Sequence, residues 1–239
     1  MKAGATALAN AASRQAMLAE RAARLHAQVA RGVLASRAQR ALATTLAEFD
    51  AGVRDLLAAA PSAEVRENYR MLQLLWADYR PHVARTPGGD PPEKLNERSE
   101  EVVWIAAKGA RLLHDPAADA RTARVRLAGE ARFQSQRIAR IHFFTAWIGR
   151  SDKRESELAT ASRDFRRALD SLLAAPADET GAAAELQLAE NQSGFLAQAG
   201  LDLKAARNPA AGLEAVAKTC DNILEVMDRV ALLYEDATA

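Results

Sequence analysis

The stretch ARFQSQRIARIHFF, residues 131–144, sets Arg132, Arg137 and Arg140 among phenylalanine and isoleucine residues in a helical pattern. Part of it has a copy 116 residues earlier, where ERAARLH (20–26) aligns with QRIARIH (136–142). The same displacement aligns FDAGVRDLLAAAP from Phe49 with FRRALDSLLAAP from Phe165. Similarity at a fixed displacement indicates an internal repeat. We therefore predict a tandem duplication, with one repeat in residues 1–116 and the second in residues 117–239.

The composition predicts a helical protein. Alanine supplies much of the 49% apolar content, aromatic residues make up 5%, and alternating runs rich in valine, isoleucine and threonine are absent. Interruptions by proline, glycine and serine delimit eight predicted helices, at about residues 5–31, 36–59, 63–80, 94–114, 117–148, 152–174, 182–206 and 209–235. Asp115-Pro116 and Asn208-Pro209 are predicted to begin two of them. We expect an all-α fold of two tandem antiparallel four-helix-bundle repeats.

The last predicted helix has the clearest apolar seam, with core residues at alternating spacings of three and four. The seam is Leu213, Val216, Cys220, Ile223, Met227, Val230 and Tyr234. We expect Cys220 to be a buried packing residue rather than a reactive thiol. The equivalent histidines His26 and His142 are likewise expected to pack rather than to bind a ligand.

Charge is distributed unevenly, although the net charge is only +1. Residues 121–150 hold seven arginines and one acid, and residues 13–40 hold six arginines and one acid, so the first helix of each repeat is basic. The later helices must therefore be acidic. The simplest interpretation is charge pairing between helices of each bundle.

Arg137 has the least expected position. At 100° per residue, Ile141, Ile148, Arg137, Phe144 and Phe133 fall in that order on an arc of about 80°, which puts Arg137 in the middle of the apolar face. Arg21 has the equivalent position in the first repeat, in weaker apolar surroundings. A buried guanidinium without a partner costs several kcal/mol, so we expect an anion to meet Arg137.

The other two arginines of this stretch project away from the centre of the apolar face. Arg140 falls at the edge of the arc and Arg132 on the far side. Both are expected either to reach a neighbouring chain or to lie on the surface.

Several function classes lack support in the sequence. None of the four histidines follows a glutamate by three residues, and no zinc-protease, phosphate-loop or serine-hydrolase motif occurs. We therefore expect no catalytic residues, no metal and no cofactor. The near-neutral charge gives no bias toward nucleic acid, and no run of about 18 apolar residues could span a membrane.

Residues 127–140, LAGEARFQSQRIAR, closely resemble the signature that opens the N-terminal sensor domain of type IV pilus methyl-accepting chemotaxis transducers, the PilJ-type domain. They are similar also to the first sensor helix of nitrate/nitrite-responsive histidine kinases. The matched positions are Ala128, Gly129, Arg132, Phe133, Gln134, Ser135, Gln136, Arg137 and Ala139. The first repeat is a degraded match that keeps Met17 and Arg21 but has Ser13 in place of the glycine and Ala16 in place of the first arginine.

The resemblance implies a non-enzymatic sensor domain in signal transduction. In the nitrate sensors a small anion lies at a dimer interface against arginines of this helix. Carried over by position, Arg132 and Arg137 are the candidate anion contacts, Gly129 allows close backbone approach, and Arg21 is a weaker counterpart. Two linked repeats could replace the family's homodimer and bring Arg21 and Arg137 together around one nitrate or nitrite. The chain carries none of the family's membrane helices or signalling modules, so we do not expect a transmembrane receptor.

Two interpretations therefore stay open. In one, the arginines recognise a small oxyanion and the chain acts with a signalling partner, as a monomer of pseudo-dimeric repeats or as a homodimer. In the other, the chain is a structural or protein-interaction bundle in which Arg137 pairs with an internal acid such as Glu225 or Asp228. The N-terminus lacks an export signal, so we expect a cytoplasmic location, or a periplasmic one if a signal has been removed.

Overall fold

Eight helices and no strand form the part of the chain that the computed structural model describes, residues 4–114, 118–175, 181–205 and 209–236. The helices are α1 (Ala5–Ala30), α2 (Ala35–Ala59), α3 (Ala63–Ala84), α4 (Pro92–Leu112), α5 (Ala120–Ile148), α6 (Asp152–Leu173), α7 (Ala182–Ala205) and α8 (Pro209–Asp236). The all-α prediction is confirmed. Helix α8 begins at Pro209 as predicted, whereas Asp115, Pro116 and Asn208 lie outside the described residues.

Among the described residues, three helices begin at a side-chain cap. Ser62, Asp119 and Ser151 each accept the backbone N–H three residues ahead, which satisfies a donor that has no partner within the helix. The Asp119 cap makes α5 begin at Ala120, later than the predicted residue 117.

Helix α3 continues through Pro81 to Ala84, four residues beyond its predicted end. A proline in the last turn removes one backbone hydrogen bond, and the extra turn buries Val83 completely. The carbonyl of Val83 lies 2.8 Å from His26 Nδ1, so burial of the α3 C-terminus outweighs the loss at Pro81.

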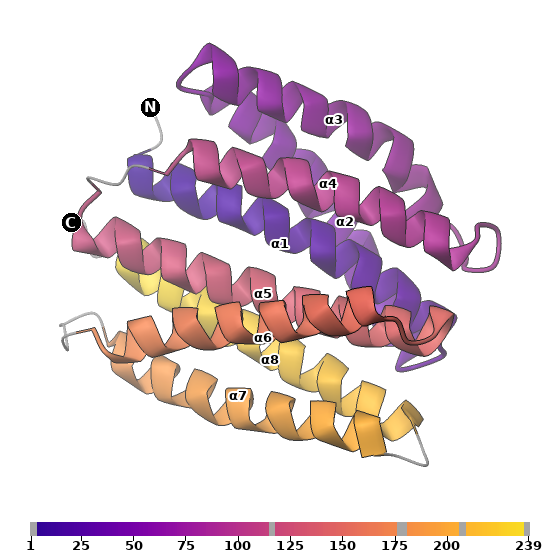
Figure 1. Ribbon diagram of the computed structural model, residues 1–239. Coiled ribbons are helices and arrows are strands. Elements are labelled where there is room, and N and C mark those ends of the chain that lie inside the picture. The colour runs from indigo at the N-terminus through magenta and orange to yellow at the C-terminus, as the bar shows by residue number, and fades with distance from the viewer. Residues whose placement is uncertain (1–3, 115–117, 176–180, 206–208, 237–239) are drawn as a thin grey trace.

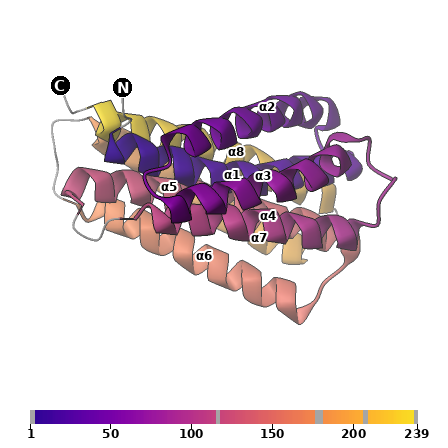
Figure 2. The same ribbon diagram turned by 90° about the horizontal axis from the view of Figure 1, so that it is seen from above.

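Helices α1 to α4 pack against one another in a ring, as do α5 to α8, and the two groups meet mainly where α1 packs along α5. Figure 1 shows α1 and α5 side by side at the centre of the molecule, running in the same direction, with α2, α3 and α4 on one side and α6, α7 and α8 on the other. Seen from above, the helices are roughly aligned along one long axis (Figure 2). The division of the chain at residue 116 stays a prediction.

Equivalent residues of the two repeats meet between α1 and α5. The hydroxyl oxygens of Thr6 and Thr122, 116 residues apart, lie 2.7 Å from each other. Seven residues on, Gly129 faces its own counterpart, Ser13, and a Cβ added to Gly129 would lie 2.4 Å from Ser13 Oγ. The glycine is therefore required by the close approach of two helices.

The apolar core includes the predicted seam of α8. All seven seam residues of α8 are buried, including Cys220, whose burial raises the pKa of the thiol to about 12. In the first repeat, Phe49 stacks on Trp76 with ring centroids 3.8 Å apart, and Tyr79 is buried beside Trp76. His26 is buried among packing residues, as predicted, and its burial lowers its pKa.

Replacing Gly129 by alanine should destabilise the protein, because the added methyl group overlaps Ser13. We expect a loss of about 1–3 kcal/mol in the free energy of unfolding, measured by urea denaturation. In a Ser13→Gly background the same change should cost much less. Gly194→Ala, on an exposed part of α7 with open space around it, should instead stabilise by roughly 0.5–1 kcal/mol. Equal effects at both glycines would contradict the close packing of α1 on α5.

Lowering the pH should destabilise the folded state through His142. Burial, with a contribution from Lys204, lowers the pKa of His142 to about 4, whereas an unfolded histidine titrates near 6.5. The unfolded chain therefore takes up the proton first, and stability present above pH 6.5 is lost as the pH falls toward 4, by about 3 kcal/mol at most. His142→Gln should show a smaller loss between pH 7 and 5 in urea denaturation. An identical pH dependence in both proteins would refute this assignment.

Candidate functional site

Arginines of α1 and α5 form three charged clusters with partners from α2, α4, α6 and α8. The first, the Arg132 cluster, consists of Asn10, Ser13, Arg14, Glu48, Arg132, Asp228 and Glu235. The second, the Glu20 cluster, consists of Glu20, Asn96, Glu100, Arg137, Arg140 and Lys153. The third, the Asp221 cluster, consists of Arg21, Arg24, Gln28, Arg37 and Asp221.

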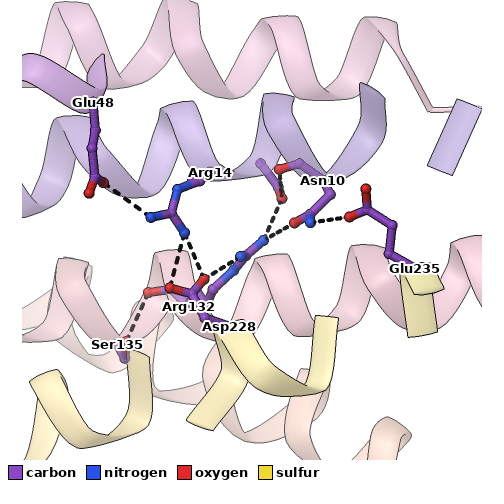
Figure 3. Close-up of polar contacts among 8 residues, drawn as sticks. Asn10, Arg14, Glu48, Arg132, Ser135, Asp228 and Glu235 are labelled. Atoms are coloured by element: carbon purple, nitrogen blue, oxygen red, sulfur yellow. Dashed lines mark hydrogen bonds and ion pairs between the residues drawn. The ribbon is translucent and has the colours of Figure 1, made fainter. Parts of the chain in front are cut away.

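In the Arg132 cluster a buried guanidinium joins both repeats. Arg132 is 1% exposed and donates through Nη1 to Asp228 Oδ1 at 2.5 Å, and through Nη2 to Asn10 Oδ1 at 2.6 Å and Ser13 Oγ at 3.1 Å. Arg14 donates to the same Asp228 and to Glu48 (Figure 3). Burial lowers the pKa of Arg132, and the charge of Asp228 acts against this effect. One carboxylate of α8 thus holds an arginine from each repeat.

In the Glu20 cluster a fully buried carboxylate of α1 meets α5. Arg140 donates through Nε to Glu20 Oε2 at 2.5 Å and through Nη1 to Asn96 Oδ1 at 2.6 Å. Burial alone would lower the pKa of Arg140, but Glu20 and Glu100 outweigh it and raise the pKa. Glu20 and Arg140 are therefore a charged pair inside the protein, which needs well-placed partners to be tolerated.

In the Asp221 cluster, Arg24 is fully buried and donates through Nη2 to Asp221 Oδ1 at 2.7 Å. Arg24 is the counterpart of Arg140, 116 residues apart. The fully buried arginine thus recurs at the same position in both repeats, but it pairs with a different acid in each.

The structure places Arg137 differently from the sequence prediction. Its side chain is 29% exposed, and its Nε lies 3.8 Å from Glu20 Oε1, beyond hydrogen-bond distance. Arg132 and Arg140, predicted to lie off the apolar centre, are the buried ones. The projection was wrong because α5 is covered by α1, α6 and α8, so its buried surface is not a single apolar arc.

Arg21 resembles Arg137 in its surroundings. Its side chain is 23% exposed, its Nη2 lies 3.8 Å from Asp221 Oδ1, and burial followed by the charge of Arg24 lowers its pKa. The Nε atoms of Arg21 and Arg137 are both buried and have no hydrogen-bond partner among the described residues. The two arginines lie in separate clusters, one against Asp221 and the other against Glu20, and within the described residues no carboxylate pairs with both.

Gly129 lies beside the Arg132 cluster, but the side of the glycine that a ligand would approach is covered by α1. Ser13 covers it, and Arg132 Nη2 would be 3.5 Å from an added Cβ. The missing side chain of Gly129 therefore lets α1 pack closely against α5.

The acids predicted to pair with Arg137 were Glu225 and Asp228, and neither forms an ion pair with it among the described residues. Asp228 pairs with Arg132 and Arg14, and the carboxylate facing Arg137 is Glu20. Sequence reasoning missed Arg24, Glu20 and Asp221. Arginine occurs at the equivalent positions 24 and 140, and this repetition could have marked both as site residues. Nothing in a single sequence distinguishes Glu20 and Asp221 from the other acidic residues.

The described residues offer neither a metal-ion cluster nor a membrane-spanning helix. No group of three or more histidine, cysteine, aspartate or glutamate side chains is arranged to hold a metal ion there. None of the described helices combines the length and apolar character needed to cross a bilayer.

Comparison with known proteins gives no match: no family model matches the chain, and no curated protein or solved structure is significantly similar to it. The resemblance to the PilJ-type domain therefore depends on the quoted residues alone.

Arg140→Ala should be strongly destabilising, because it leaves the carboxylate of Glu20 buried with only Arg137 at 3.8 Å. We expect a loss of about 3–5 kcal/mol in the free energy of unfolding, measured in urea. Replacing both partners, as Glu20→Leu with Arg140→Met, should recover most of that loss, since no unpaired charge is left.

The matched control is Arg70→Ala, which breaks an exposed pair with Glu67 and should change stability far less. A double variant as unstable as Arg140→Ala would show that the pair itself, rather than the uncompensated charge, determines stability.

Proposed function

We propose that the protein is a non-enzymatic helical module of the signal-transduction type, in which the arginines of the first helices form internal salt bridges that fasten the two repeats together. The observation that carries this proposal is that Arg24, Arg132 and Arg140, the most deeply buried arginines among the described residues, each contact a carboxylate on another helix. These guanidinium groups are already neutralised, so they need no anion from solution.

Because the buried arginines pair within the protein, contacts with other molecules would be made by its outer surface. The outer helices carry large exposed apolar side chains, among them Leu74 on α3, Trp104 on α4 and Phe195 on α7, which are 67%, 60% and 61% exposed. Exposed aromatic residues are typical anchors of protein interfaces. A protein partner is therefore the contact that we favour for this module.

A second function, recognition of a small oxyanion such as nitrate or nitrite, is favoured by Arg137 and Arg21. Each has a buried Nε without a hydrogen-bond partner and a partly exposed side chain. A small anion bound there would have to displace or share Glu20 or Asp221, since each arginine already faces one of these carboxylates. This competition makes the second function the weaker of the two.

Thermal unfolding in nitrate or nitrite separates the two functions. If the arginines serve only the internal salt bridges, nitrate should raise the midpoint no more than chloride at equal ionic strength. If Arg137 binds the anion, stabilisation should grow with the logarithm of ligand concentration, reaching about 2.7 kcal/mol at a hundred times Kd, and should vanish in Arg137→Ala.

Arg21→Ala tests the equivalent position, and Arg163→Ala, on an exposed part of α6, is the surface control. A nitrate-specific shift that is lost in Arg137→Ala but kept in Arg163→Ala would overturn the salt-bridge proposal.

A further inference from the structure

The second repeat contains a cavity of about 500 Å³ between α5, α6 and α7. Its walls are mainly apolar, with Ile138 from α5, Leu158 and Phe165 from α6, and Leu196 and Leu203 from α7. Cavities of this size commonly hold small organic ligands. The cavity lies apart from the three arginine clusters and is independent of the function proposed above.

The cavity exists because α7 lacks the aromatic side chains of α3. A displacement of 117 residues matches the buried positions of the two helices and places Tyr69, Trp76 and Tyr79 of α3 on Leu186, Ser193 and Leu196, which are buried in α7. The only aromatic residue of α7, Phe195, is 61% exposed. The first repeat thus has an aromatic plug, Trp76 and Tyr79, where the second repeat has the smaller Ser193 and Leu196, which line the cavity.

The opposite wall shows the same change. Phe49, which stacks on Trp76, corresponds to Phe165, which lines the cavity instead. On α6, Ser162 lines the cavity at the position of Leu46, which is buried in the first repeat. The second bundle therefore has smaller side chains than the first on two helices at one place, while Phe165 presents its apolar surface there.

Cationic side chains surround the apolar walls. Arg150, Arg154, Arg166 and Lys204 line the cavity, against one acid, Glu155. Arg150 pairs with Glu155, and Arg166 pairs with Asp170 and Glu190. Arg154 donates to the carbonyl of Gly149, and neither Arg154 nor Lys204 has a carboxylate partner among the described residues. Two positive charges at this cavity are thus available to an anionic group.

Polar groups in the wall can add hydrogen bonds. Thr145 and His142 of α5 line the cavity beside Ser162 and Ser193. His26, the counterpart of His142, is held by the Val83 carbonyl, whereas His142 has no hydrogen bond of this kind within the described chain. The imidazole of His142 is therefore free to donate to, or accept from, a bound molecule.

From these observations we propose that this cavity binds a small amphipathic carboxylate of the medium-chain fatty acid type, with its apolar body against Ile138, Phe165 and Leu196 and its carboxylate against Arg154 and Lys204. The apolar walls supply the main favourable free energy, because the ligand body leaves water. The two cations select an acid over an alcohol of equal length, since charge-assisted hydrogen bonds are stronger than neutral ones.

Isothermal titration calorimetry with decanoate, below its micelle concentration, tests the proposal. We expect saturable binding of one decanoate per chain, at least about tenfold weaker binding of decanol, and no binding of acetate. Lys204→Gln and Arg154→Gln should each weaken decanoate binding severalfold. Lys218→Gln, on an exposed part of α8 away from the cavity, should leave it unchanged.

Filling the cavity is the decisive variant. Ser193→Trp with Leu196→Tyr restores the plug of the first repeat at two positions that line the cavity and should abolish binding. Ser162→Leu is a milder substitution with the same purpose, and helical circular dichroism checks that each variant is folded. Decanoate binding that persists in a folded filled variant, or no saturable binding by the wild type, would overturn the proposal. Equal affinity for decanol and decanoate would overturn the assignment of the carboxylate to Arg154 and Lys204.

Discussion

Burial of guanidinium groups between α1 and α5 is the constraint on which the rest of the structure depends. A charge removed from water is tolerated only with close, correctly placed partners. The partners come from other helices: Glu20 from α1, Asp228 and Asp221 from α8, and Asn96 from α4. The charges thereby specify how α1, α4, α5 and α8 must be aligned, which apolar packing alone would leave less well defined.

The sequence predicts much of this fold because its repeats and seams are local patterns. The α8 seam, including Cys220, is buried as predicted, and the eight helices agree within a few residues. The position of Arg137 was not predictable from a helical projection, because α5 is packed on several sides. Small residues such as Ala128, Gly129 and Ala139 form much of its buried surface, and a search for large apolar side chains overlooks them.

The charged clusters were predictable only in part. The sequence indicates that arginines of the first helices need anions, and Arg24 and Arg140 recur at equivalent positions. Which acid meets which arginine depends on tertiary packing, so Glu20 and Asp221 could not be selected among many acidic residues. The sequence also contains a hint of the cavity, because α7 has a single aromatic residue. Predicting a cavity from it would have required knowing which buried positions of α3 and α7 correspond.

The contact between Gly129 and Ser13 has a consequence for how such a molecule can diverge. In a homodimer with a two-fold axis along these helices, the residue at this point would meet an identical copy of itself. A single chain is free of that restriction: a glycine can face a serine, and Arg132 can be buried where the equivalent residue, 116 positions earlier, is Ala16. Covalent linkage thus permits an interface in which a large side chain packs on a small one and a charged residue is equivalent to an uncharged one. Each half of the chain can therefore have features that the other half lacks.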